Sequence, residues 1–202
     1  MPRRIFRILA DFPEQIILFI GLTSLDDARN RSVEPGCPPA TARLANFALA
    51  REYNLPYLLC RFDPTLPGVD DAPGKLLELL EAVARHGARQ VSAAYLFLTP
   101  LANRDRLAQD PYLRAAIPHC ADACPTEDGV CFSVPLGRKI ETSEWLHAEC
   151  AKRGLSFGTC GCKDLRMIGS SFPTSCSYPY LAECSGASRK RPTSLAISVR
   201  QG

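Results

Sequence analysis

The sequence lacks most of the motifs by which common enzyme classes are recognised. It has no glycine-rich phosphate loop, no G-x-S-x-G nucleophile motif and no H-E-x-x-H zinc motif. Its only histidines are His86, His119 and His147, so a hydrolytic triad has no starting point. His86 lies at a predicted helix end, where a capping role is expected. His119 and His147 lie near cysteines and are candidate metal ligands.

Long apolar runs and a secretion signal are also absent. No stretch approaches the roughly 18 apolar residues of a membrane span. The N-terminus starts with basic and then apolar residues, but Asp11, Pro13 and Glu14 interrupt the apolar stretch, and no small-residue cleavage site follows. A net charge of +3 is too small to indicate nucleic acid binding by itself. We therefore expect a soluble, cytoplasmic protein with no membrane partner.

Cysteine is the residue type in excess, with ten among 202 residues. Cys37 and Cys60 stand alone, and the others crowd the second half of the chain. Without a secretion signal, such a cluster favours metal or iron–sulfur ligation, and a disulfide framework is the alternative. Neither of two possible ligand sets has a zinc-finger spacing, so several thiols could instead be small buried hydrophobes. The first set is Cys150, Cys160, Cys162 and Cys176, and the second is Cys120, Cys124 and Cys131.

Strand and helix patterns alternate over the first 118 residues, which favours an α/β fold. Buried strands are predicted at residues 16–23, 55–64 and 89–100, each followed by a loop and a helical pattern. Such units imply right-handed crossovers and a parallel sheet. The loops after the strands are longer and more polar than the other connections. We therefore expect functional groups at the carboxyl edge of the sheet.

From residue 119 onward the composition changes. A helix is predicted in TSEWLHAECAKRG and a short strand in LSFGT, within a segment rich in cysteine, serine and glycine. The sequence thus predicts a sheet domain over residues 1–118, a Cys-rich extension packed on it over residues 119–186, and a disordered basic tail over residues 187–202.

Two polar residues at predicted strand ends are candidates for ligand binding. Arg61 interrupts an apolar strand, where a charge is costly to bury unless it is paired. Its guanidinium is expected either to pair internally with Asp63 or Glu34, or to bind a ligand carboxylate or phosphate. Ser24, at the end of the first strand, is either a turn residue or a hydrogen-bond donor to a ligand.

Several segments, in their order along the chain, resemble a known family. They are GLTSLD at residues 21–26, VEPGCPPATARL at 33–44, RFDPTLPGVDD at 61–71 and HGARQVSAAYLFL at 86–98. This order is similar to the second half of a radical S-adenosylmethionine (radical SAM) barrel of the spore-photoproduct-lyase-like group, also labelled DNA repair photolyase-like. The late segment with TCGCKDLRMIGSSFPTSC resembles C-terminal parts of related proteins, which implies an additional iron–sulfur or zinc site.

The resemblance implies a partial (β/α) barrel with about three parallel βα units. It also implies a [4Fe–4S] cluster and reductive cleavage of SAM to a 5′-deoxyadenosyl radical in the complete enzyme. Ser24 and Arg61 would contact SAM, and Glu34 and Arg43 would pair to hold the loop between them. The residues that would border the substrate are those near Val69–Asp71 and Leu98–Pro100.

The cluster-binding C-x3-C-x2-C loop of the family precedes these segments, and the sequence does not contain it. The resemblance therefore implies the C-terminal half of such an enzyme, truncated or split. Its partner would be a separate N-terminal half-barrel chain or an electron donor, and its substrate a small molecule or a nucleic acid. The alternative is a non-catalytic cysteine-rich module that binds zinc or an iron–sulfur cluster on an α/β scaffold. An ordinary α/β enzyme with merely buried cysteines is a third hypothesis.

Overall fold

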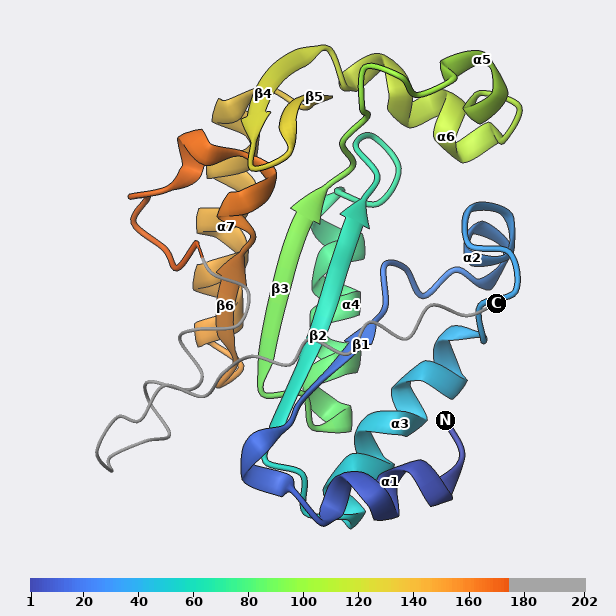
Figure 1. Ribbon diagram of the computed structural model, residues 1–202, viewed down its shortest axis with the longest axis vertical. Coiled ribbons are helices and arrows are strands. Elements are labelled where there is room, and N and C mark those ends of the chain that lie inside the picture. The colour runs from blue at the N-terminus through green and yellow to red at the C-terminus, as the bar shows by residue number, and fades with distance from the viewer. Residues whose placement is uncertain (175–202) are drawn as a thin grey trace.

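The computed structural model describes residues 1–174 and has a parallel four-stranded sheet at its centre (Figure 1). The strand order is β1-β2-β3-β6. In register, Leu59 of β2 lies beside Gln90 of β3, which lies beside Ser156 of β6. The predicted α/β class with a parallel sheet is therefore confirmed. The strands are β1 Ile17–Gly21, β2 Tyr57–Thr65, β3 Gln90–Tyr95 and β6 Ser156–Thr159.

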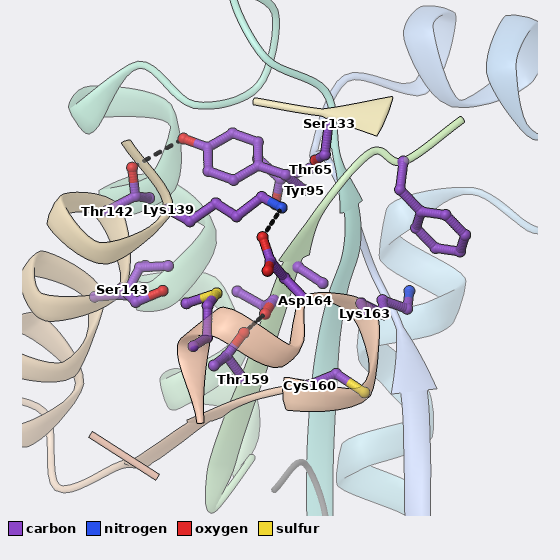
Figure 2. Close-up of a pocket in the computed structure, with 15 residues that line it drawn as sticks. Thr65, Tyr95, Ser133, Lys139, Thr142, Ser143, Thr159, Cys160, Lys163 and Asp164 are labelled. Carbon is purple, nitrogen blue, oxygen red and sulfur yellow. Dashed lines mark hydrogen bonds and ion pairs between the residues drawn. The ribbon is translucent and has the colours of Figure 1, made fainter. Parts of the chain in front are cut away.

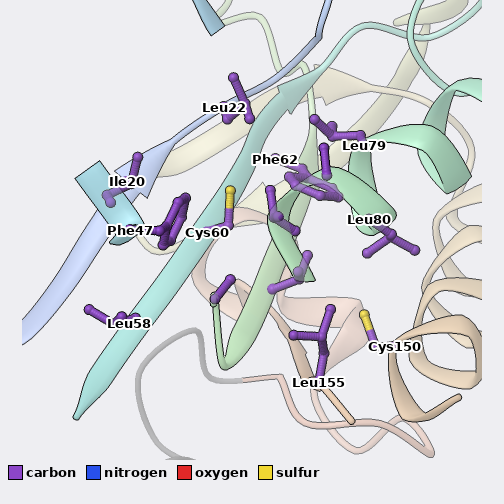
Figure 3. Packing of buried hydrophobic residues seen from close by; sticks show 14 of the residues in the cluster. Ile20, Leu22, Phe47, Leu58, Cys60, Phe62, Leu79, Leu80, Cys150 and Leu155 are labelled. Atoms are coloured by element: carbon purple, nitrogen blue, oxygen red, sulfur yellow. The ribbon is translucent and has the colours of Figure 1, made fainter. Parts of the chain in front are cut away.

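Three long helices pack on one face of the sheet and share one hydrophobic core with it (Figure 3). Consecutive parallel strands joined by right-handed crossovers place every crossover helix on the same side. On β2 the core residues are Leu58, Cys60 and Phe62, so the alternate residues of that strand point to the opposite face. The helices are α3 Ala40–Glu52, α4 Pro73–His86 and α7 Leu136–Ala151.

The sequence of α4 shows why these helices form. Its buried residues Leu76, Leu79, Leu80 and Val83 recur at helical spacing and make one apolar stripe. Gly87 ends the helix in the left-handed conformation, with φ 95°. The left-handed backbone at this position favours glycine, and a Cβ here would also displace the exposed Arg51 side chain of α3, whose Cδ would lie 2.3 Å away.

Shorter helices and a hairpin lie between the strands and long helices of the core. An antiparallel hairpin, β4–β5, stands beside the end of β3, and its strand β5 meets Leu98 through two backbone hydrogen bonds with Phe132 of 2.7 and 2.8 Å. The third strand therefore ends at Tyr95 and not at the predicted residue 100. The elements are α1 Arg3–Ala10, α2 Asp27–Val33, α5 Arg104–Leu107, α6 Pro111–Ala116, β4 Asp122–Thr126 and β5 Gly129–Ser133, with short 3-10 helices at Pro13–Gln15, Ile117–His119, Gly161–Lys163 and Leu165–Met167.

The segment predicted as an extension contributes to the same sheet. Strand β6, with helix α7 before it, pairs in parallel with β3, so that Val91 lies beside Phe157. The sheet thus has four strands where about three were predicted. The short strand was predicted in LSFGT, but its pairing with β3 was not, because β6 has only four residues and the hairpin and α7 separate it from β3. The predicted tail, residues 187–202, lies outside the described residues.

The two edge strands differ. Beyond β6 the chain covers its own edge, because Thr159 N–H donates to Pro173 O at 3.0 Å and Gly161 N–H donates to Thr174 O at 2.7 Å. On β1, Leu22 N–H donates to β2, so the peptide groups of Ile17, Phe19 and Gly21 point away from the sheet. Arg43 donates to Gly21 O at 3.3 Å. The outward peptide groups of Ile17 and Phe19 have no partner within residues 1–174. No helix in this part of the chain is long and apolar enough to cross a membrane.

Candidate functional site

The first ionic cluster at the carboxyl edge, called the Arg29 brace below, consists of Thr23, Arg29, Glu34, Arg43 and Asp70. The buried Arg29 guanidinium lies 2.5 Å from Asp70 Oδ2 and 3.1 Å from Glu34 Oε1. Arg43 lies 2.8 Å from Glu34 Oε2, and the Thr23 hydroxyl donates to the same carboxylate. Glu34 and Arg43 thus form the ion pair that the loop motif implies. The cluster joins the loop after β1 to the loop after β2.

Local sequence explains how the brace is positioned. Asp26 caps α2 by accepting from Ala28 N–H and Arg29 N–H at 2.8 and 3.1 Å. The Asp70 carboxylate also accepts from Leu66 N–H at 3.0 Å, which closes the loop after β2. Arg29 and Asp70 are therefore held by backbone turns that begin within a few residues of a strand end.

The pKa values of the two carboxyls in the brace move in opposite directions. Burial acts to raise the pKa of Glu34, but the Thr23 hydroxyl and the Arg43 guanidinium outweigh it and hold that pKa below its ordinary value. At Asp70, burial is the larger effect, so its pKa is raised although Arg29 partly offsets the shift. The brace is largely buried and each of its carboxylates accepts from at least two donors, which suits a structural role.

The second cluster, called the Asp63 cluster below, consists of Arg61, Asp63 and Lys163. The Asp63 carboxylate accepts from Arg61 Nη2 at 2.5 Å and from Lys163 Nζ at 2.5 and 2.6 Å. Arg61 is 36% exposed and Lys163 23%, whereas Asp63 is 9% exposed. The Arg61 guanidinium lies 5.9 Å from the centre of the Phe19 ring, and Lys163 Nζ lies 4.9 Å from that of Phe97. Two cations with aromatic neighbours therefore share one carboxylate.

A third cluster surrounds the buried Asp164. Lys139 Nζ donates to Asp164 Oδ2 at 2.7 Å, and Arg166 donates to both oxygens at 2.8 and 2.9 Å. Burial acts to raise the pKa of Asp164, but the hydrogen bonds from Arg166 and Lys139 outweigh it and lower that pKa. Arg166 also reaches Asp122 of β4 at 2.8 Å. This cluster ties α7 and the hairpin to the turns after β6.

A small cavity lies beside this cluster, between β3, α7 and the end of β6 (Figure 2). Its volume of about 30 Å³ holds one or two water molecules, far below the roughly 300 Å³ of a small ligand site. The Tyr95 hydroxyl donates to Asp71 at 2.9 Å, and burial raises the pKa of Tyr95 to about 12. The cavity is thus part of the packing and not a substrate pocket. Its lining includes Tyr95, Lys139, Thr142, Thr159, Lys163 and Asp164.

The predicted ligand-binding residues lie near the carboxyl end of β1: Ser24 follows this strand, and Arg61 of β2 lies beside its last residue, Gly21. The Ser24 side chain accepts from Asp26 N–H at 3.1 Å, which is the turn role considered for it. Arg61 pairs with Asp63, the first of the two internal partners considered, and not with Glu34. Both residues are only partly buried, so each side chain still reaches the surface at the carboxyl edge.

The predicted substrate-bordering residues are engaged within the protein. Asp70 belongs to the brace, and Asp71 accepts from Tyr95 and, at 2.5 Å, from Arg138. Leu98 is held by the hairpin strand β5. These positions line the edge of the sheet, but their polar groups already have partners.

The first set of candidate cysteine ligands is not brought together. Cys150 is buried in the core near the amino end of β6, where Leu155 N–H donates to its carbonyl at 3.0 Å. Cys160 and Cys162 follow the carboxyl end of the same strand and form a disulfide with each other. Cys176 lies outside the described residues. Within residues 1–174 no group of three or more His, Cys, Asp and Glu side chains could hold a metal ion.

The second set, Cys120, Cys124 and Cys131, lies buried around the hairpin. Cys124 is directly opposite Cys131, and its thiol donates to the Cys131 carbonyl at 3.4 Å. Burial raises the pKa of Cys120 to about 11 and also raises that of Cys124. Because the thiolate is the metal ligand, protonated buried thiols match the interpretation of small hydrophobes.

The histidines have structural neighbours. His86 Nδ1 lies 2.7 Å from Ala82 O at the end of α4, near the predicted cap. The His119 ring packs on Gly68, where a Cβ would lie 2.7 Å from Nε2. The ring of His147, an exposed residue of α7, lies 6.2 Å from the ring of Phe157, which belongs to the core.

Sequence reasoning missed Lys163 and the Lys139–Asp164 pair. Lys163 is 100 positions from Asp63, and no local pattern relates them. The available signal was the position of Lys163 and Asp164 directly after a predicted strand, where parallel sheets carry functional groups. No family model, curated protein or solved structure matches the chain.

Proposed function

We propose that this chain is the C-terminal half of a radical SAM (β/α) barrel of the spore-photoproduct-lyase-like group and contributes to its SAM-binding edge. One observation carries the proposal. The four parallel strands lie in the order of the chain, with their long helices on one face. A doubly wound sheet would reverse its strand order and carry helices on both faces, whereas a barrel sector has this arrangement.

The difference between the two sheet edges supports the same proposal. Residues 173 and 174 bond to the carboxyl end of β6, whereas the outward peptide groups of Ile17 and Phe19 on β1 have no partner in the described part of the chain. The sequence of β1, ILFIG, has no charge or proline of the kind that protects a free edge. A preceding strand, in a second chain or in a longer form of this one, would pair here and extend the barrel.

Arg61 and Ser24 are the proposed SAM contacts. Arg61 lies in β2 beside Gly21, the last residue of β1, and Ser24 follows that strand end. Nε and Nη1 of Arg61 have no hydrogen-bond partner among the described residues. A guanidinium with free donors suits a carboxylate, which SAM carries on its methionine part. The Arg29 brace holds the loop beside these two residues.

The described residues do not fit a [4Fe–4S] cluster. Cys160 and Cys162 are joined in a disulfide, and the hairpin thiols are buried, two of them with raised pKa values. We therefore assign the catalytic cluster to the other half of the barrel. No step of the reaction is derived from this chain.

Calorimetric titration of the whole chain with S-adenosylhomocysteine tests the proposal. We expect one site, weakened about tenfold or more by Arg61→Ala, because a hydrogen bond between two charged groups is lost. Arg4→Ala, which removes an exposed arginine from α1 near the amino edge, is the matched control. A chain that shows no binding at millimolar ligand, or equal binding by both variants, contradicts the proposal.

A further inference from the structure

Five side chains from different parts of the chain meet at the Asp63 cluster. Arg61 and Asp63 come from β2, Lys163 from the turn after β6, Phe97 from the loop after β3, and Phe19 from β1. Strand β2 sends Arg61 and Asp63 to the face opposite the helices. This convergence is set by the sheet and not by local sequence.

The charge of the cluster is unbalanced. Both oxygens of Asp63 are engaged by Lys163, and one of them also by Arg61, so one carboxylate faces two cations. Asp164, which follows Lys163 in the sequence, does not balance this charge because its carboxylate already pairs with Lys139 and Arg166. One positive charge therefore remains at a partly buried position, where an anion would stabilise it.

A purely structural tie between β2 and the turn after β6 would not need this surplus. One cation satisfies one carboxylate, and Lys163 alone already reaches both oxygens of Asp63. Arg61 adds a second cation and keeps Nε and Nη1 without a partner in residues 1–174. These two donors point to different sides of the guanidinium, so each can donate to a separate oxygen of a carboxylate or phosphate.

We propose that Arg61 and Lys163 bind the anionic group of a small organic ligand and that Phe19 and Phe97 contact its planar or apolar part. The chemistry required is a carboxylate or a phosphate monoester joined to an aromatic or apolar group. SAM, with a carboxylate and an adenine, is one source of this chemistry, and in that form the inference rests on the proposed function. A nucleoside monophosphate is the other source.

The test is calorimetric titration of the whole chain with inorganic phosphate, adenosine monophosphate, adenosine and S-adenosylhomocysteine. The variants are Arg61→Gln, Lys163→Gln, Lys163→Arg and Phe97→Ala, with Arg4→Gln and Lys152→Gln as exposed controls. Thermal unfolding of each variant shows that it is folded before it is titrated.

We expect adenosine monophosphate to bind at one site more tightly than phosphate, and adenosine to bind weakly or not at all. Arg61→Gln and Lys163→Gln each weaken the anions about tenfold, whereas Lys163→Arg and both controls do not. Phe97→Ala weakens adenosine monophosphate severalfold and leaves phosphate unchanged, because only the nucleotide has a ring to place on the phenyl group.

Three results would overturn the inference: no anion binds at millimolar concentration, the two glutamine variants bind as well as wild type, or all arginine and lysine variants weaken binding equally. The two proposals can fail separately. If phosphate and adenosine monophosphate bind through Arg61 and Lys163 but S-adenosylhomocysteine does not, the anion site stands and the SAM proposal fails. If S-adenosylhomocysteine binds without dependence on Lys163, the anion site fails and the SAM proposal stands.

Discussion

The Arg29 brace and the Asp63 cluster use the same kinds of side chains at adjacent strand ends, but they differ in charge and burial. In the brace, Arg29 and Arg43 face Glu34 and Asp70, so two cations meet two carboxylates. In the Asp63 cluster, two cations meet one carboxylate. Arg29 is 1% exposed, whereas Arg61 is 36% exposed.

The difference follows from the cost of burying charge. A charge removed from water must be matched by partners, so the deeper cluster has as many cations as carboxylates. A cluster in contact with water tolerates an excess charge, since solvent screens it. Arg29 Nε and Arg43 Nη2 of the brace also lack a hydrogen-bond partner within residues 1–174, but they are buried, so a ligand can reach only the donors of the exposed cluster. The brace provides the loop beside that cluster.

The largest expected effect is on the brace. Arg29→Met leaves Asp70 without its buried cation and Glu34 with Arg43 alone, and we expect the free energy of unfolding to fall by about 3–5 kcal/mol. Urea unfolding at pH 7 measures this change. Arg31→Met, on the exposed side of the same helix, is the control and is expected to change stability by less than about 0.5 kcal/mol. A loss below about 1 kcal/mol for Arg29→Met would show that the brace is not a tightly coupled network.

A smaller, pH-dependent effect is expected at Glu34. Its pKa is below the ordinary value of 4.5 in the folded protein, so its contribution is present above pH 4.5 and is lost as the pH falls through the folded pKa. We expect Glu34→Gln to cost about 1–3 kcal/mol at pH 7, the value of hydrogen bonds to a charged group. This cost should shrink between pH 4.5 and pH 3.

Urea unfolding of wild type and Glu34→Gln at several pH values measures this convergence. The raised pKa of Asp70 acts in both proteins and cancels in the difference. Glu78→Gln, on the exposed face of α4, is the control and should show no such pH dependence. A cost for Glu34→Gln that stays constant down to pH 3 would contradict the role of the charged carboxylate.

The parts of the fold that the sequence predicts are those with local signals. Buried strands read as apolar runs, and β1, β2 and β3 each carry one, followed by a helical pattern. The pairing of β6 with β3 was not predicted, because it joins residues more than sixty positions apart and only four residues of β6 take part. Sheet order is decided by packing, which a local pattern does not contain.

The site was predictable to the same degree. A motif implied the pairing of Glu34 with Arg43, and Arg61 was placed beside Asp63 as one of two internal partners. The cysteine count predicted a ligand set, but Cys150 faces the core and its burial raises its pKa to about 12. Which face of a helix a thiol occupies depends on how the helix docks, and composition does not determine that.

The smallest expected effect is at one of the two cations that share the Asp63 carboxylate. Lys163→Gln leaves Asp63 paired with Arg61, so no buried charge loses its last partner, and we expect the free energy of unfolding to change by less than about 1 kcal/mol. Urea unfolding beside Arg29→Met gives the contrast directly. A loss of 3 kcal/mol or more for Lys163→Gln would place the Asp63 cluster in the same class as the brace, and its excess charge would then be a structural requirement and not a feature available to a ligand.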